Sequence, residues 1–188
     1  MRFILASGSP RRLELLRQIG IEPIVSVSNF SEAVSSSSPS ILVKENARGK
    51  ALDVLKKFSP NDIIIAADTV VVLDNKVLGK PKTKDEAKEM LKALSGKTHE
   101  VLTGVTVLFM GKEETAVEKT LVHFRKLSEE EISNYVATGE PMDKAGAYGI
   151  QGKGAILIKG TEGCYNNVVG LPLTRIYELF LRLKIILE

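Results

Sequence analysis

The stretch from residue 63 to residue 73 constrains the fold more than any other part of the chain. It reads Ile-Ile-Ile-Ala-Ala-Asp-Thr-Val-Val-Val-Leu, with Asp68 as its single charged residue. An apolar, β-branched run without alternating polar residues is typical of a strand that is covered on both faces. Such strands lie in the centre of α/β sheets. The sequence therefore predicts a central strand here, interrupted by the polar pair Asp68-Thr69.

Shorter apolar runs and helical patterns alternate along the rest of the chain. Two helices start at a predicted capping box, Thr83 with Glu86 and Ser128 with Glu131. Hairpins and helical crossovers occur together, which predicts one α/β domain over residues 1–188 with a mixed central sheet and flanking helices. We expect a polar, Ser-rich loop at 28–40, strands at 2–6, 24–27, 76–78, 101–109, 116–124, 155–159 and 165–169, and helices at 10–19, 41–58, 83–95, 128–139 and 172–184.

Composition excludes several classes of protein. The 26 Lys and Arg nearly balance the 23 Asp and Glu, for a net charge of +3. This balance argues against a nucleic-acid binder, which usually carries a concentrated basic excess. A single Cys excludes an intramolecular disulfide and a Cys-based zinc site. No apolar run approaches the roughly 18 residues of a membrane span, and a signal-peptide pattern is missing. We expect a cytoplasmic protein without nucleic-acid or membrane partners.

Asp68 is the first candidate for chemistry. An unpaired buried carboxylate is very costly, so Asp68 must be hydrogen-bonded, metal-bound or at the exposed end of the strand. Successive strand residues point to opposite faces, so the strand must end or bulge if Asp68 and Thr69 are to face one site. Open α/β sheets bind ligands at the carboxyl ends of their strands. The alternative is a structural Asp that binds local backbone.

A second candidate is the segment Ser7-Gly8-Ser9-Pro10-Arg11-Arg12. Ser9 as N-cap with Pro10 in the first helical position indicates a helix start, whose free N–H groups favour anions. Two arginines in the first turn oppose the helix dipole, which favours a negative partner. The alternative is an ordinary capped helix with solvated arginines.

The most distinctive segment is 141–154. Four glycines fall within nine residues of it, and Asp143, Lys144 and Gln151 lie along it. A loop this constrained yet polar indicates a functional site. Judged from its local sequence alone, Lys50 is expected to be a solvated lysine on a helix, and Lys80 a lysine in a turn.

Six collinear segments between residues 3 and 180 resemble the Maf family of nucleotide pyrophosphatases. They are 6–16 (Ala-Ser-Gly-Ser-Pro-Arg-Arg-x-Glu-Leu-Leu), 66–71 (Ala-Ala-Asp-Thr-Val-Val), 79–81 (Gly-Lys-Pro), 94–99 (Leu-Ser-Gly-x-x-His), 140–152 (Glu-Pro-Met-Asp-Lys-Ala-Gly-Ala-Tyr-Gly-Ile-Gln-Gly) and 170–172 (Gly-Leu-Pro). The resemblance implies an elongated α/β fold with a mixed sheet and a deep cleft, related to the inosine triphosphatase group.

The resemblance also implies an activity, hydrolysis of a nucleoside triphosphate to the monophosphate and pyrophosphate with Mg²⁺ or Mn²⁺. In this family Asp68 would be the general base. The residues that match the family's other site positions are Ser7, Arg11, Lys50, Lys80 and Lys144 for the phosphates, and Asp68, Glu32 and Asp143 for the metal. Glu32 follows a segment, Ser28-Asn29-Phe30-Ser31, that is less acidic than in relatives.

Three further residues, Arg12, Thr69 and Gln151, are similar to the selectivity residues of the family branch that acts on dTTP and UTP. The Gln151 amide can accept from N3–H and donate to O4 of uracil or thymine, whereas cytosine presents the reversed pattern. The family also implies a house-cleaning role, in which modified pyrimidine nucleotides are candidate substrates, and a homodimer is one candidate assembly.

Two other classes of function remain open from the sequence. One is a nucleotide-responsive regulatory protein linked to cell division, for which the serines at 35–38 in the polar loop are the motivation. Saturable nucleotide binding without hydrolysis would distinguish it. The other is nucleic-acid binding, which the +3 charge and the small number of aromatic residues disfavour.

Overall fold

The computed structural model describes residues 1–34 and 38–187, so three of the serines in the predicted loop, 35–37, lie outside the described residues. The chain forms two compact units. Unit 1 contains Met1–Asp68, Thr103–Glu118 and Gly170–Glu188, and unit 2 contains Thr69–Leu102 and Lys119–Val169. The strands β3 (Ile63–Leu73), β5 (Thr98–Phe109) and β6 (Lys112–Phe124) contribute residues to both units. A single domain over residues 1–188 stays a prediction.

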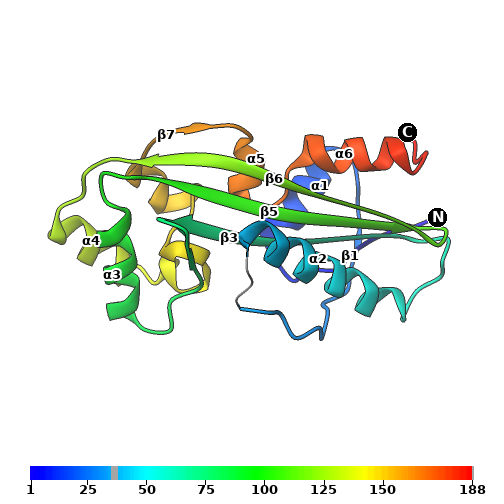
Figure 1. Cartoon of the computed structure of the whole chain (residues 1–188), viewed down its shortest axis with the longest axis horizontal. Coiled ribbons are helices and arrows are strands. Elements are labelled where there is room, and N and C mark those ends of the chain that lie inside the picture. The colour runs from blue at the N-terminus through cyan, green and yellow to red at the C-terminus, as the bar shows by residue number, and fades with distance from the viewer. Residues whose placement is uncertain (35–37, 188) are drawn as a thin grey trace. The chain divides into compact units, whose positions relative to one another are not determined.

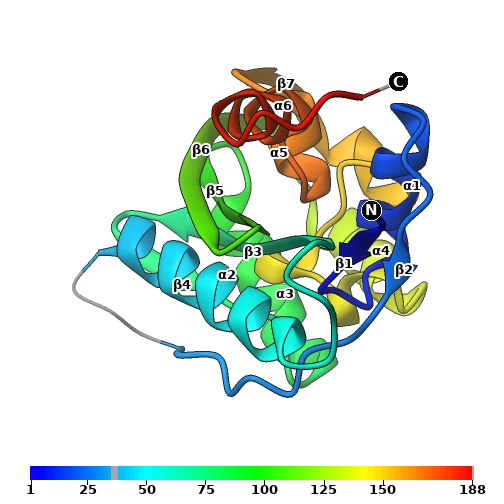
Figure 2. The ribbon, with the colours of Figure 1, turned by 90° about the vertical axis from the view of Figure 1, so that its right-hand side faces the viewer.

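In unit 1, two short parallel strands extend the sheet beyond β3. The strand β1 (Phe3–Leu5) pairs in parallel with β3 on one side and with β2 (Ile24–Val25) on the other. The helices of this unit are α1 (Pro10–Gln18), α2 (Pro39–Leu55) and α6 (Leu173–Arg182), and Figure 2 shows α2 and α6 on opposite faces of the strands. Parallel pairing here and antiparallel pairing elsewhere confirm the predicted mixed sheet.

Alternating residues of β1 explain this two-sided cover. Ile4 packs with Ala51 and Val54 of α2. Phe3 points to the other face, where its ring lies 5.9 Å from that of Phe180 on α6. In β3, Ile64 and Ala66 join the same cluster as Ile4, and Ile63 and Ile65 are fully buried. Both faces of its first half are therefore covered, which is why its sequence is apolar without alternation.

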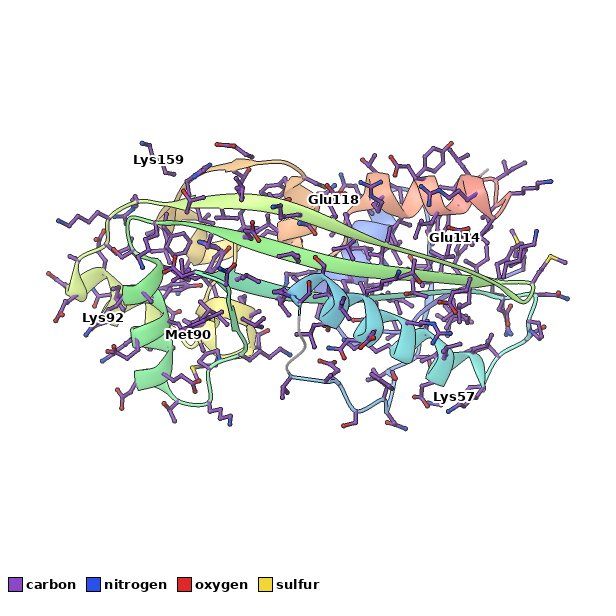
Figure 3. All side chains as sticks on the ribbon, in the orientation of Figure 1. Lys57, Met90, Lys92, Glu114, Glu118 and Lys159 are labelled. Atoms are coloured by element: carbon purple, nitrogen blue, oxygen red, sulfur yellow. The ribbon has the colours of Figure 1, made fainter. Side chains whose placement is uncertain are left out.

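Charged pairs on the surface also hold α6 against β6. Glu118 accepts from Arg175, and Glu114 lies 3.5 Å from Arg182. The two glutamates are labelled in Figure 3. Exposed pairs of this kind each contribute little to stability. The apolar contacts of α6 are therefore the main reason for its position.

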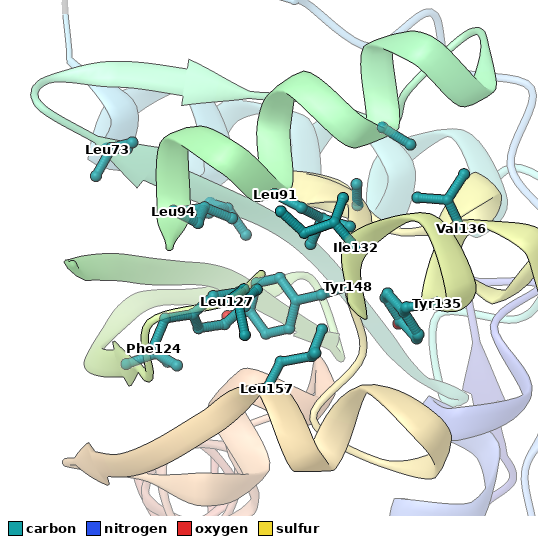
Figure 4. Close-up of a cluster of buried hydrophobic side chains, with 14 of the residues drawn as sticks. Leu73, Leu91, Leu94, Phe124, Leu127, Ile132, Tyr135, Val136, Tyr148 and Leu157 are labelled. Carbon is teal, nitrogen blue, oxygen red and sulfur yellow. The ribbon is translucent and has the colours of Figure 1, made fainter. Parts of the chain in front are cut away.

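In unit 2, two antiparallel strands are added: β4 (Lys76–Leu78) pairs with β3, and β7 (Ile158–Glu162) pairs with β6. The helices α3 (Lys84–Leu94) and α4 (Glu129–Ala137) lie side by side (Figure 1). Their inner faces pack into one apolar cluster with Phe124, Tyr148 and Leu157 (Figure 4). Between α4 and β7 the chain forms three short 3₁₀ helices, η1 (Glu140–Asp143), η2 (Ala145–Ala147) and η3 (Gly152–Leu157).

Local signals predicted several boundaries. At α4 the capping box is complete: Ser128 Oγ accepts from Glu131 N, and Glu131 Oε2 accepts from Ser128 N. At α3, Thr83 accepts from Glu86 N as expected, but the Glu86 carboxylate binds the N–H of Lys82 instead of Thr83. The predicted hairpin joins β5 to β6, and its turn is made by Met110 and Gly111, both with positive φ.

One predicted strand, 165–169, is wrong, and another, 155–159, is displaced along the chain. Residues 165–169 form a helix, α5 (Tyr165–Val169), and residues 155–157 belong to η3, so that the strand starts only at Ile158. The helical turn of α5 places the Asn167 amide in the interior, where it donates to Val101 O and Thr120 Oγ1, both at 3.0 Å. Other boundaries move by a few residues, since α2 spans 39–55 and β2 only 24–25. Among the described residues, no helix is long and apolar enough to cross a bilayer.

Candidate active site

In unit 1, the candidate site begins where β1 ends. Past Leu5, the N–H of Ala6 still donates to Ile65 O over 2.8 Å. The next residue, Ser7, accepts the N–H of Ser9 with its hydroxyl over 3.2 Å. Ser9 is the N-cap of α1 as predicted, but its side chain makes no cap hydrogen bond within the described part of the chain. The side chain that stabilises this turn is therefore that of Ser7, whereas the sequence predicts that of Ser9.

Arg12 joins three segments of unit 1. Its Nη1 donates to Ser7 Oγ over 3.1 Å and to Ala67 O over 2.9 Å, and its Nε donates to Gly170 O over 2.8 Å. Burial lowers the pKa of Arg12, and the negative charge of Asp68 opposes that shift. Arg12 thus contacts two backbone carbonyls, while Arg11 is half-buried on the same turn of α1.

Asp68 lies in the interior of unit 1 and is held by two side chains of α2. It is 6% exposed. Lys50 Nζ lies 2.7 Å from its Oδ1, and Asn46 Nδ2 donates to its Oδ2 over 3.0 Å. Because Asn46 and Lys50 are four residues apart, one face of α2 presents both donors. Asp68 therefore binds side chains that are distant in the sequence, whereas the structural alternative expected local backbone.

The position of Asp68 in its strand differs from the expectation. β3 continues through Asp68 and Thr69 to Leu73, so Asp68 is not at the end of its own strand. It lies three residues beyond Ile65, the partner of Leu5, and so past the carboxyl end of β1. The strand end that opens this site is therefore that of β1. Thr69 is half-buried and belongs to unit 2.

Glu32 reaches the same lysine as Asp68. Lys50 Nζ lies 2.7 Å from Glu32 Oε1 as well as 2.7 Å from Asp68 Oδ1. One ammonium is thus shared by two carboxylates, which leaves a net negative charge of one. Carboxylate oxygens are the ligands that Mg²⁺ and Mn²⁺ prefer. The pair Glu32 and Asp68 therefore has the donor atoms for a divalent cation, with Lys50 and Arg12 as neighbouring positive charges.

The segment that carries Glu32, residues 28–33, is fastened to α2; we call it the Glu32 segment. At one end, Asp53 Oδ2 accepts from Ser28 Oγ and from Asn29 N, over 3.0 and 2.8 Å. Both hydrogen bonds lower the pKa of Asp53, and the bond from the Asn29 N–H has the larger effect. At the other end, Asn46 exchanges two hydrogen bonds with the backbone of Ala33, over 2.9 and 3.0 Å.

A glycine on α2 makes room for the Glu32 segment between these two ends. A Cβ added at Gly49 would lie 2.3 Å from the ring of Phe30. Gly104 on β5 has a similar role beneath the helix, because its added Cβ would lie 2.3 Å from Val43 O of α2. The residues Asn46, Gly49, Asp53 and Gly104 were not recognised from the sequence. The spacing of Asn46, Gly49 and Asp53 on one helical face is the signal that points to the first three.

In unit 2, the predicted residues gather around the glycine-rich segment. Lys144 Nζ donates to Glu140 O and to Asp143 Oδ1, each over 2.7 Å. Gly146 has a φ of +68° and donates its N–H to Gly79 O over 3.0 Å, which brings the turn containing Lys80 to the same segment. Lys80 and Gln151 are exposed.

The predicted residues thus fall into two groups. Ser7, Arg12, Glu32, Lys50 and Asp68 are brought together in unit 1, with Arg11 on the turn of α1 that carries Arg12. Thr69, Lys80, Asp143, Lys144 and Gln151 lie in unit 2. Across the described ranges, no three His, Cys, Asp or Glu side chains are arranged to hold a metal ion by themselves.

Comparison with known proteins shows which family the chain resembles. The family model for the Maf-like proteins matches residues 2–183. The dTTP/UTP pyrophosphatase of Agathobacter rectalis is 50% identical over 194 residues, which cover 94% of this chain and 95% of that protein. That of Symbiobacterium thermophilum is 52% identical, covering 95% of this chain and 92% of that protein.

A solved structure agrees on the fold alone. The HAM1 protein from Coxiella burnetii superposes with a TM-score of 0.50 at 18% identity, over 66% of this chain and 73% of that chain. The predicted α/β fold with a mixed sheet is thus confirmed. With a family match over nearly its whole length and relatives at half identity, this chain belongs to the Maf family.

Proposed function

We propose that this protein hydrolyses dTTP and UTP to the nucleoside monophosphate and pyrophosphate. The observation that carries the proposal is the buried carboxylate of Asp68, held by Lys50 and Asn46 and accompanied by Glu32. The names of the relatives, dTTP/UTP pyrophosphatase at about half identity, support the substrate. A cytoplasmic location and a homodimer stay predictions from the sequence.

Asp68 would be the general base. Breaking the α–β phosphoanhydride requires a water molecule to lose a proton as it attacks, and an ionised carboxylate accepts that proton. Lys50 binds one oxygen of Asp68 and Asn46 the other, and a carboxylate oxygen has capacity for a second hydrogen bond. Lys50 and Asn46 thus orient the carboxylate and leave lone pairs for water. Positioned acid–base groups contribute roughly 10²–10⁴-fold to rates.

Glu32 and Asp68 would hold the divalent metal, since their oxygens already converge on one cation, the ammonium of Lys50. Mg²⁺ is commonly bound by one or two carboxylates together with substrate phosphates, and these two residues fit that mode. When bound, the metal would neutralise charge that develops on the phosphate oxygens. Asp143 is the third ligand in the sequence prediction, and it bonds Lys144 in unit 2.

The remaining predicted residues would bind and select the substrate. The phosphate contacts assigned by the family pattern are Ser7, Arg11, Lys50, Lys80 and Lys144. Gln151 would read the base, since its amide matches N3–H and O4 of thymine and uracil. Thr69 and Arg12 complete the selectivity set. The contacts of Arg12 with Ser7 and Ala67 favour a role in which it also fixes the turn after β1.

The test is a substrate panel. The protein is incubated with Mg²⁺ or Mn²⁺ and each common or modified nucleoside triphosphate, and the released pyrophosphate is quantified. We expect release from dTTP and UTP, loss of turnover in Asp68→Asn, and normal turnover in Asp74→Asn, an exposed aspartate in the β3–β4 turn. Saturable nucleotide binding without any pyrophosphate from dTTP or UTP would contradict the proposal and favour the regulatory alternative.

A further inference from the structure

Tyr135 and Glu140 form a hydrogen-bonded pair at the end of α4. Tyr135 is 6% exposed, and its ring belongs to the apolar cluster of unit 2 (Figure 4). Its hydroxyl donates to Glu140 Oε1 over 2.9 Å. Between the two residues α4 ends, and Gly139, with a φ of +77°, reverses the chain. This turn brings the carboxylate of Glu140 back to the tyrosine.

Three backbone N–H groups of the glycine-rich segment bind this pair. Glu140 Oε2 accepts from Lys153 N over 3.0 Å, and Glu140 Oε1 accepts from Gly154 N over 3.0 Å. The hydroxyl of Tyr135 accepts from Gly149 N over 3.2 Å. Burial alone would raise the pKa of Glu140, but the N–H groups of Lys153 and Gly154, with the tyrosine hydroxyl, hold it below its usual value. The carboxylate is therefore ionised and acts as an acceptor.

These bonds fix the backbone on both sides of Gln151. The bonded N–H groups belong to residues two positions before it and two and three positions after it. Gly152 has a φ of +72°, and a Cβ added there would lie 3.0 Å from Glu140 Oε2. A Cβ added at Gly154 would lie 2.3 Å from Gly149 O. The glycines thus permit the close approach, and the exposed Gln151 side chain projects from a backbone that the pair holds in place.

Glu140 also holds Lys144, through its main chain. Lys144 Nζ donates to Glu140 O over 2.7 Å. The stem of the lysine lies over Gly149, where an added Cβ would be 2.8 Å from Lys144 Cε. One residue therefore binds the phosphate-contact lysine with its carbonyl and the base-reading segment with its carboxylate.

We propose that Glu140, together with Tyr135, is a positioning residue that sets the place of the Gln151 amide relative to the Lys144 ammonium. The inference rests on the proposed function, because it assigns these two groups to base and phosphate. Selecting a pyrimidine by one amide requires that the amide be correctly placed when the phosphates are bound. A pair that serves only to stabilise the fold would change stability but not the choice between bases.

The experiment compares dTTP and dCTP, which differ at the atoms that Gln151 would read. Glu140→Gln replaces one acceptor oxygen with an NH₂ group that faces N–H donors, and Tyr135→Phe removes both bonds of the hydroxyl. We expect the ratio of kcat/KM for dTTP to that for dCTP to fall roughly 10–100-fold, mainly through a higher KM for dTTP. The matched control is Glu131→Gln, which removes the capping carboxylate at the other end of the same helix.

The possible results distinguish a failure of this inference from a failure of the proposed function. If the ratio is unchanged in both variants, the inference is overturned. It is also overturned if Glu131→Gln lowers the ratio as much at an equal loss of Tm, because the fall would then be an effect of lower stability. If Glu140→Gln does not fold, Tyr135→Phe decides alone. A wild-type protein that turns over neither dTTP nor UTP would overturn the proposed function, and this inference with it, before any variant is compared.

Discussion

The amide nitrogen of Asn46 lies 3.0 Å from Oδ2 of Asp68 and, at the same time, 3.0 Å from the backbone oxygen of Ala33. Its amide oxygen accepts the N–H of Ala33. One buried side chain thus joins the candidate general base to the segment that carries Glu32. The orientation of Asp68 and the place of Glu32 therefore depend on the same residue of α2.

Replacing Asn46 with Leu, which has a similar size, should lower kcat for dTTP by roughly 10–100-fold. The change leaves one oxygen of Asp68 without its partner and releases one end of the Glu32 segment. Steady-state kinetics measures kcat, and a thermal melt measures Tm to show whether the variant is folded. Asn134→Leu, on the exposed face of α4, is the control and should change neither quantity much. Full activity of Asn46→Leu would show that Lys50 alone orients Asp68.

Replacing Lys50 with Met should reduce the free energy of unfolding by about 3 kcal/mol, because the buried carboxylate of Asp68 loses its counter-charge. Urea denaturation measures this loss. The double variant Lys50→Met with Asp68→Asn should recover part of it, since no buried charge then remains unpaired. If the double variant is as unstable as the single one, the loss arises from packing of the lysine stem and the electrostatic explanation is wrong.

Replacing Gly104 with Ala should reduce the free energy of unfolding by about 1–3 kcal/mol, because the new methyl would meet the backbone of α2 at Val43. The helix must shift, and it carries both donors to Asp68, so we also expect turnover to fall. Gly160→Ala, on β7, is matched to it, since an added Cβ there meets nothing within 4 Å. Equal stability of the two variants in urea would contradict the close approach.

The stability of the protein should fall as the pH is lowered from 7 to 5, because of His99. Burial, and secondly the charge of His123, lower the pKa of His99 from 6.5 to about 4. Between these two values the unfolded chain binds a proton that the folded chain does not, so acid favours unfolding. Lowering the pH from 6.5 to 5 should therefore reduce the free energy of unfolding by about 2 kcal/mol.

The measurement is the urea unfolding free energy of wild type, His99→Gln and His123→Gln at both pH values. The loss between pH 7 and pH 5 should be smaller by about 2 kcal/mol in His99→Gln. It should change little in His123→Gln, which removes only the lesser cause of the pKa shift. His123 is the control because it is less buried and hydrogen-bonded to Glu162 and Thr98. The same pH dependence in all three proteins would rule out His99 as its source.

Much of the fold could be predicted because its signals are local. The unbroken apolar run of β3, the capping box at Ser128 and the turn at Gly111 each follow from residues within a few positions of one another. The same reasoning failed at 165–169, Tyr-Asn-Asn-Val-Val, where the tyrosine and the two valines favour a strand and no local signal indicates the helical turn. There the deciding contact is between Asn167 and Val101, which lie 66 residues apart in the chain.

The sequence by itself determined which residue types are present for chemistry: Asp68 within an apolar strand, the arginines after Ser9 and the glycines around Gln151. Only the tertiary structure decided how they are held. Asn46 and Gly49 become part of the site because α2 meets the Glu32 segment there, and Asn46 also reaches Asp68 of β3. Glu140 becomes part of it because a chain reversal returns its carboxylate to Tyr135. Such contacts join residues whose spacing in the chain carries no periodic signal, so they follow from packing and not from local pattern.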